Sequence, residues 1–309
     1  EYIEYFEDYN LSLTQRLGKI TVFGRARNKE YKMNEAQSGK DKLVKYQRHG
    51  HIGFIILNTP EKRNALNPFV WDALNKTIGM AEKDEEARVV LLQGEGKSFC
   101  AGLDLSPDNS LFPQIMGPPS ALQKMNLFRA IRNVQDIHTR LERLPKPTIA
   151  VIHAHCLGAG LELALCCDIR LCSAETLFAL PEASLAIITD VGGLQRLPKV
   201  VGRGHAREIA FRGHRFDAQR AQAINLVNHV YPDQETLKEK AIEIAQEISE
   251  NPPLAVQGAK EVFLYDEESG LDQSLNYNAA RSSMIMPSED LSKAVSATME
   301  KRKGEFKGK

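Results

Sequence analysis

Three acidic side chains are the residues of this sequence best suited to chemistry. Glu182 and Asp190 lie eight residues apart, and Glu162 lies inside the apolar run 161–167. A carboxyl group in apolar surroundings must be hydrogen-bonded, paired or protonated. Such burial can raise its pKa into the range useful for acid–base catalysis. The three acids therefore predict proton transfer, although Glu182 alone fits a solvated loop and Asp190 alone fits a turn or a helix cap.

Two glycine-containing turns are the second feature with chemical potential. They are Ser98–Leu105 (SFCAGLDL) and His155–Glu162 (HCLGAGLE). Glycine lets a ligand approach the main chain closely. A helix start leaves N–H groups without intrahelical partners, and the helix dipole attracts negative charge to them. Each turn alone is also common where a strand simply packs against the following helix. Two turns that face each other would form an oxyanion hole.

The strands and helices that must position these residues can be predicted from hydrophobic runs and from the residues that end them. Short apolar runs predict five buried strands, and caps and prolines predict the helices. Apolar strands without alternation indicate a sheet covered on both faces, and strands interleaved with helices indicate an α/β core. The predicted strands cover residues 52–57, 89–92, 148–152, 169–172 and 226–230, and the predicted helices cover 68–83, 121–144, 203–223 and most of the chain after 233.

The patterning also suggests three regions. Residues 1–45 are weakly patterned and predict an N-terminal extension, residues 46–250 predict the α/β core, and residues 251–309 predict a helical C-terminal region. Within the extension, residues 11–28 contain basic but no acidic side chains. That composition fits a transit peptide and a surface extension about equally well.

Composition narrows the classes of partner. The 40 basic and 40 acidic side chains balance, which argues against nucleic acid or an anionic membrane as a partner. No apolar run of about 20 residues is present, so we expect no membrane span. The five cysteines lack paired metal-ligand spacing and predict small buried thiols, with no structural metal.

Several motifs together resemble the enoyl-CoA hydratase/isomerase (crotonase) superfamily. SFCAGLDL, LGAGLEL followed by CCDIR, and LPEASLAIITDVGGLQRLPKVVG occur in that family's order and spacing, over about residues 48–305. The resemblance implies a crotonase-like spiral of ββα units with a helical C-terminal trimerisation region. It also implies an oxyanion hole formed by the N–H groups of Leu103 and Ala159, with Glu162 and Glu182 at the two catalytic carboxylate positions. An acyl-CoA thioester would be the substrate, with no separate cofactor.

Asp190 distinguishes among the family's reactions. Within TDVGGLQRLPKVVG it resembles the aspartate of the Δ3,5-Δ2,4-dienoyl-CoA isomerases of fatty acid β-oxidation. By that resemblance, Asp190 removes a proton at C2 of a 3,5-dienoyl-CoA and Glu182 delivers one at C6. Those isomerases carry aspartate where this chain has Glu162, so an enoyl-CoA hydratase that activates water with Glu162 and Glu182 is the alternative. A non-catalytic or RNA-binding paralogue is the alternative from another class, and the neutral charge weighs against it.

The same resemblance suggests how coenzyme A binds and how subunits assemble. Segment 61–67 (EKRNALN) is similar to the family's coenzyme A loop, although its basic side chains could equally be solvated. Relatives commonly form homotrimers or dimers of trimers. We expect a mitochondrial location if the source is eukaryotic and a cytoplasmic one otherwise, because the final residues are not a peroxisomal signal. The loop from residue 104 to about 123 would shape the acyl pocket. The candidate coenzyme A contacts are Lys62, Arg63, Ala65, Leu66, Gly102 and Lys301.

Overall fold

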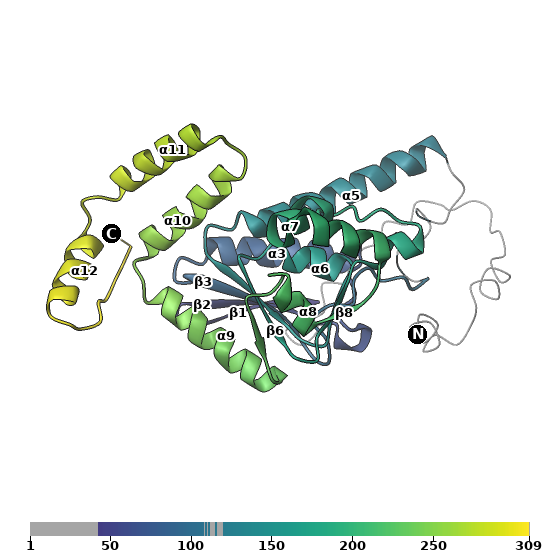
Figure 1. Ribbon diagram of the computed structural model, residues 1–309, viewed down its shortest axis with the longest axis horizontal. Helices are drawn as coiled ribbons and strands as arrows, with labels where there is room; N and C mark the ends of the chain where they lie inside the picture. Colours follow the sequence, from purple (N-terminus) through teal and green to yellow (C-terminus); the bar gives the residue numbers. More distant parts are fainter. Residues whose placement is uncertain (1–42, 108, 110, 112–114, 116–119, 309) are drawn as a thin grey trace, which may run out of the picture. The chain divides into compact units, whose positions relative to one another are not determined.

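The computed structural model of the protein describes residues 43–107, 109, 111, 115 and 120–308 (Figure 1). Almost all of the predicted extension 1–45, with its transit-like stretch, lies outside the described residues. Much of the expected acyl-pocket loop also lies outside them. The first described strand begins at Val44, within the last two residues assigned to the extension.

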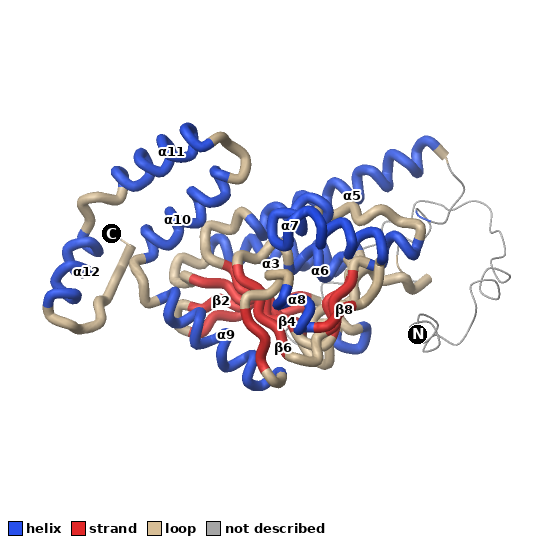
Figure 2. The backbone as a smooth tube through the Cα atoms, in the orientation of Figure 1, coloured by secondary structure: helices blue, strands red, loops and turns tan. Residues whose placement is uncertain are grey.

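A six-stranded sheet forms the centre of the fold (Figure 2). Its strand order is β1-β2-β3-β4-β6-β9; β1 is antiparallel to β2, and the other neighbouring strands run parallel. Two predicted strands have the expected bounds, whereas the run 226–230 contributes only its end to β9. The strands are β1 (Val44–His49), β2 (Ile52–Leu57), β3 (Val89–Gly94), β4 (Thr148–Ile152), β6 (Ile169–Ser173) and β9 (His229–Tyr231).

The two faces of this sheet pack against different helices. In β2, Ile55 and Leu57 join a core cluster with side chains of α3 (Pro68–Lys83) and α5 (Ala121–Glu142). The alternate residues of β2 join a second cluster with α9 (Gln234–Ser249). Because both faces are covered, the strand is apolar throughout, as the uninterrupted hydrophobic run predicts.

A second, three-stranded sheet carries one of the glycine turns. It consists of β5 (His155–Leu157), β7 (Leu177–Ala179) and β8 (Phe216–Asp217), in that order. Strands of two or three residues show no readable periodicity, so hydrophobic patterning did not predict β7 and β8. The chain leaves β5 through Gly158 and enters the short helix α6 (Ala159–Ala164).

The helical C-terminal half differs in detail from the helices predicted around 203–223. Helix α7 (Gly193–Arg212) starts earlier, and Gly213 separates it from α8 (Ala218–Ala223). Its N-cap, Gly192, provides no capping side chain, which hides this start from sequence analysis. The remaining helices are α10 (Pro253–Asp266), α11 (Leu271–Met284) and α12 (Glu289–Met299).

All five cysteines are free and buried, which confirms their interpretation as core thiols. Among the described residues, no helix combines the length and apolar character needed to cross a membrane.

Candidate active site

The two glycine turns lie side by side; we call residues 100–103 and 156–160 the turn pair. A parallel bridge joins Cys100 to Cys156, and the Leu157 N–H donates to the Cys100 carbonyl oxygen over 3.1 Å. A Cβ added at Gly102 would lie 2.6 Å from the Leu157 carbonyl oxygen and 3.6 Å from the Ala159 nitrogen. The structure therefore brings together the two turns that the sequence singled out.

Both predicted oxyanion-hole donors belong to this pair. Leu103 forms a parallel bridge with Leu66, in which the neighbours of Leu103 make the hydrogen bonds. Ala159 is the first residue of α6, where N–H groups lack intrahelical partners. Within the described part of the chain, neither the Leu103 nor the Ala159 N–H donates to a protein acceptor. Two unused donors at adjacent turns can stabilise a developing oxyanion.

Glu182 lies directly against the turn pair. It belongs to the short 3-10 helix η2 (Pro181–Leu185), and a Cβ added at Gly158 would lie 2.6 Å from its Oε1. Its other oxygen, Oε2, accepts a hydrogen bond of 3.2 Å from the Thr189 hydroxyl. Burial raises the pKa of Glu182, and the negative charge of Asp190 adds to the rise. A proton on this carboxyl group is therefore easier to retain, as a general acid requires.

Glu162 is buried, and its carboxyl group accepts hydrogen bonds from main-chain N–H groups. Its side chain is 2% exposed, and Oε2 accepts the N–H groups of Gly193 at 2.6 Å and Val191 at 3.2 Å. These bonds provide the cap that Gly192 cannot give to α7. Burial raises the pKa of Glu162 to about 8, and the charges of Glu182 and Asp190 push it in the same direction. A protonated carboxyl can still accept both N–H groups through one oxygen.

Asp190 lies in the same segment; we call residues 181–193 the acid loop. Burial raises the pKa of its carboxyl group. The main-chain carbonyl of Asp190 accepts a hydrogen bond from Gln135 of α5, and that of Val191 accepts one from His138. Each of the three predicted acids thus lies in the acid loop or binds it; the charge of Asp190 raises the pKa of Glu182, and the charges of Glu182 and Asp190 raise that of Glu162. No sequence pattern indicated roles for Thr189, Gln135 and His138. For Gln135 and His138, the only available signal was a polar residue on the core-facing side of a predicted helix.

The predicted coenzyme A loop adjoins the turn pair. The Ala101 N–H donates to the Arg63 carbonyl oxygen at 3.0 Å, and the Leu66 N–H donates to the Gly102 carbonyl oxygen at 2.7 Å. The Lys62 ammonium pairs with the buried carboxylate of Asp104 at 3.0 Å. Lys62 therefore already has an anionic partner in this structure, a pairing that the sequence did not suggest.

The last predicted contact, Lys301, follows α12 and is exposed. Among the described residues, no hydrogen bond or ion pair connects it to the segment around Ala65. Its expected role depends on contact with a neighbouring subunit.

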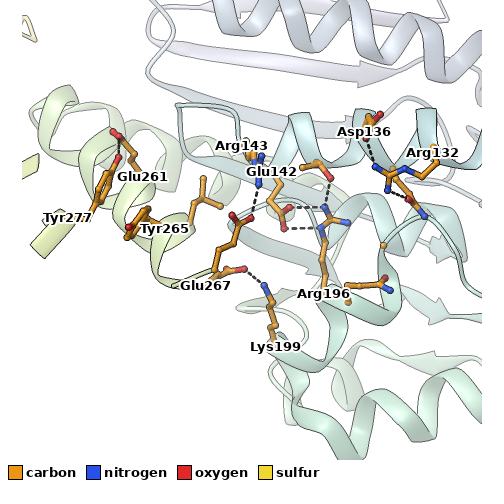
Figure 3. Close-up of a pocket in the computed structure, with 16 residues that line it drawn as sticks. Arg132, Asp136, Glu142, Arg143, Arg196, Lys199, Glu261, Tyr265, Glu267 and Tyr277 are labelled. Carbon is orange, nitrogen blue, oxygen red and sulfur yellow. Dashed lines mark hydrogen bonds and ion pairs between the residues drawn. The ribbon is translucent and has the colours of Figure 1, made fainter. Parts of the chain in front are cut away.

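A cleft of about 890 Å³ lies beyond the acid loop, between α5, α7, α10 and α11 (Figure 3). Gln135 and Gly192 are among its lining residues, so it reaches the outer side of the loop. Arg196 makes a two-point ion pair with Glu142 across the cleft, with N–O distances of 2.8 and 2.7 Å. Its charged lining suits ion pairing between helices better than an apolar acyl chain.

Comparisons with known proteins agree with this geometry. A family model described as "Enoyl-CoA hydratase/isomerase" matches residues 47–309. A mitochondrial Delta(3,5)-Delta(2,4)-dienoyl-CoA isomerase from Dictyostelium discoideum is 37% identical over 83% of this chain and 87% of its own. A short-chain-enoyl-CoA hydratase from Clostridium acetobutylicum is 35% identical over 83% of this chain and 94% of its own. A crystal structure of an enoyl-CoA hydratase from Bacillus anthracis superposes with a TM-score of 0.79 at 32% identity, covering 86% of this chain and all of that one.

Proposed function

Because this chain belongs to the enoyl-CoA hydratase/isomerase family and is an enzyme of it, we propose that it converts a 3,5-dienoyl-CoA into the 2,4-dienoyl-CoA. The observation that carries the proposal is the third carboxyl group, Asp190, in the same loop as Glu182 and with a raised pKa. Relatives named as dienoyl-CoA isomerases, at 36 to 37% identity, support the same reaction.

The proposed chemistry is a proton shuttle along a conjugated chain. Asp190 takes the C2 proton, and the electron pair forms the C2–C3 double bond through a dienolate whose oxygen is held by the N–H groups of Leu103 and Ala159. The π electrons of the C3–C4 bond move to C4–C5, and the π electrons of the C5–C6 bond take up a proton that Glu182 gives to C6. One proton leaves and one arrives, so the substrate keeps its charge and composition. Donors of this kind are worth about 3 kcal/mol each at a developing oxyanion.

Two carboxyl groups suit this shuttle because the sites of proton loss and gain are four carbons apart. The raised pKa of Asp190 makes it a stronger base than an exposed aspartate, and the raised pKa of Glu182 favours the protonated form that must donate. The acid and the base therefore have environments that favour their separate tasks.

A two-substrate assay tests this proposal. The purified protein is offered a 3,5-dienoyl-CoA and a trans-2-enoyl-CoA, and the ultraviolet spectrum follows the gain or loss of conjugation. We expect the dienoyl substrate to be isomerised. Reaction of the 2-enoyl substrate alone would overturn the proposal.

Hydration of a 2-enoyl-CoA is the second candidate function. It is favoured by the presence of Glu182 in the acid loop and of Glu162 beside it, and by the similarity to the Clostridium acetobutylicum hydratase. In that reaction Glu162 and Glu182 would share one water molecule. The two hydrogen bonds that Glu162 Oε2 already accepts from main chain leave it less free for this task.

We also propose that the enzyme works as a homotrimer or dimer of trimers, with Lys301 reaching coenzyme A bound to a neighbouring subunit. Large apolar side chains exposed on the C-terminal helices support an interface there: Phe263 at 72%, Leu271 at 71%, Met284 at 79% and Met299 at 79%. Light scattering on the purified chain measures the assembly, and a monomer would contradict the proposal.

A further inference from the structure

Two side chains of α5 hold the main chain of the acid loop. Gln135 and His138 are three residues apart and so lie on one face of the helix. The Gln135 Nε2 donates to the Asp190 carbonyl oxygen over 2.5 Å, and the His138 Nδ1 donates to the Val191 carbonyl oxygen over 3.1 Å. Two successive carbonyl groups of the loop are therefore anchored to a helix more than fifty residues earlier in the chain.

Neighbouring groups fix the direction of both donors. Arg132 can only donate, and its Nη1 donates to the Gln135 Oε1 at 2.7 Å, which turns the amide nitrogen toward Asp190. His138 is fully buried, and burial together with the charge of Arg196 lowers its pKa to about 3. The ring is therefore neutral, with its proton on Nδ1. Among the described residues, its buried Nε2 has no hydrogen-bond partner.

Glu162 holds the same segment from the other side. Its Oε2 accepts the Val191 N–H, which belongs to the same peptide group as the Asp190 carbonyl. That peptide group is thus fixed at both ends, by Gln135 and by Glu162. No other described residue is seen to donate a hydrogen bond to the Asp190 carboxylate, so its direction depends on the main chain.

We propose that Gln135 and His138 are positioning residues for Asp190: by anchoring the carbonyls of Asp190 and Val191, they set where the candidate base meets the substrate. The inference rests on the proposed function for its catalytic consequence. A misplacement of about 1 Å in a reacting group can cost about 10²-fold in rate. The loop continues into Gly192 and Gly193, which offer little resistance to such a shift once the anchors are lost.

The experiment compares variants that remove or keep a donor. Gln135→Met and His138→Leu remove the N–H donor and keep a side chain of similar size. His138→Asn keeps an amide donor near the position of Nδ1. Asn133→Leu, an exposed amide on the same helix, is the matched control. Each variant is tested for steady-state isomerisation and for amide hydrogen–deuterium exchange of peptides covering residues 187–194.

We expect Gln135→Met and His138→Leu to lower kcat by about 10- to 100-fold with KM nearly unchanged, and to speed exchange in the loop. His138→Asn should recover most of kcat, and Asn133→Leu should behave as the unaltered enzyme. The proposal is overturned if Gln135→Met and His138→Leu leave both kcat and the rate of loop exchange unchanged. It is also overturned if KM rises and kcat does not fall.

Two further outcomes remain decisive. If His138→Leu does not fold, Gln135→Met, at a half-buried position, decides by the same readouts. If the unaltered enzyme does not isomerise a dienoyl-CoA, the proposed function fails by itself. Loop exchange then decides whether Gln135 and His138 anchor the segment: faster exchange supports the anchor, and unchanged exchange overturns it.

Discussion

Main-chain N–H groups form one half of the candidate site, whereas carboxyl side chains form the other. The turn pair is held by strand-like hydrogen bonds between Cys100 and the segment around Leu157. The acid loop is held by side chains from α5 and α6, through Gln135, His138 and Glu162. The turn pair should therefore tolerate many side chains but no added bulk at its glycines, whereas the acid loop should respond to single functional groups.

This difference separates what the family's reactions share from what distinguishes them. An oxyanion hole serves any reaction that passes through a thioester enolate, so damage to the turn pair should affect isomerisation and hydration alike. A carboxyl group acts at one carbon of one substrate. Changes in the acid loop should therefore alter the two reactions unequally.

Among changes that should impair both reactions, the largest effect should come from Gly102→Ala in the turn pair. The φ of Gly102 is 91°, and a Cβ there would lie 2.6 Å from the Leu157 carbonyl oxygen, so the two turns must move apart. We expect kcat to fall by about 10²- to 10³-fold on either substrate, the usual cost of one oxyanion donor. Gly204→Ala, where nothing lies within 4 Å of the added Cβ, is the control. A loss confined to one substrate would contradict the shared role of the turn pair.

In the acid loop, Glu162→Gln should change how stability depends on pH. The folded state raises the pKa of Glu162 from 4.5 to about 8, so folding favours its protonated form. Its contribution is fully present below about pH 4.5 and is lost as pH rises toward 8, a change on the order of a few kcal/mol. The neutral glutamine can still accept the N–H groups of Val191 and Gly193.

Thermal unfolding of both proteins at pH 5 and pH 9 measures this effect. We expect the Tm of the unaltered protein to fall more than that of Glu162→Gln between the two pH values. An equal fall in both would mean that Glu162 is already ionised in the folded protein.

A smaller effect should follow from Thr189→Val. The Thr189 hydroxyl donates to Glu182 Oε2 and lowers the pKa of that carboxyl group, opposing burial. Without the hydroxyl the pKa of Glu182 rises further, so the general acid stays protonated to higher pH. We expect the alkaline limb of the kcat profile to move upward, with kcat altered by less than about 10-fold, in line with one hydrogen bond. Thr189→Ser keeps the hydroxyl and should leave the limb in place; a downward shift in Thr189→Val would refute this role.

The sequence predicts the turn pair well because its information is local. Glycines at the ends of apolar runs indicate turns, and the order of the motifs indicates which turns meet. The bridge between Leu66 and Leu103, which joins segment 61–67 to the turn pair, was not predicted from the sequence. What the sequence also misses here is the ion pair between Lys62 and Asp104, since partners 42 residues apart leave no local pattern.

The acid loop is less predictable because its support comes from distant elements. Glu162 is visible as an acidic residue inside an apolar run, whereas Glu182 and Asp190 stand out through the motif that contains them. The anchors Gln135 and His138 belong to a helix whose residue spacing predicts only which face is buried. The early start of α7 is hidden for the same reason: its cap is Glu162 and not a residue beside Gly192.

Asp190→Asn, assayed on both substrates, tests the central claim most directly. The amide keeps the shape of the side chain but cannot take a proton from C2. We expect isomerisation of the 3,5-dienoyl-CoA to fall by about 10²- to 10⁴-fold, the usual worth of a general base, while hydration of the 2-enoyl-CoA changes by less than about 10-fold. Equal losses in the two reactions, or undiminished isomerisation, would contradict the role of Asp190 as the residue that selects the chemistry.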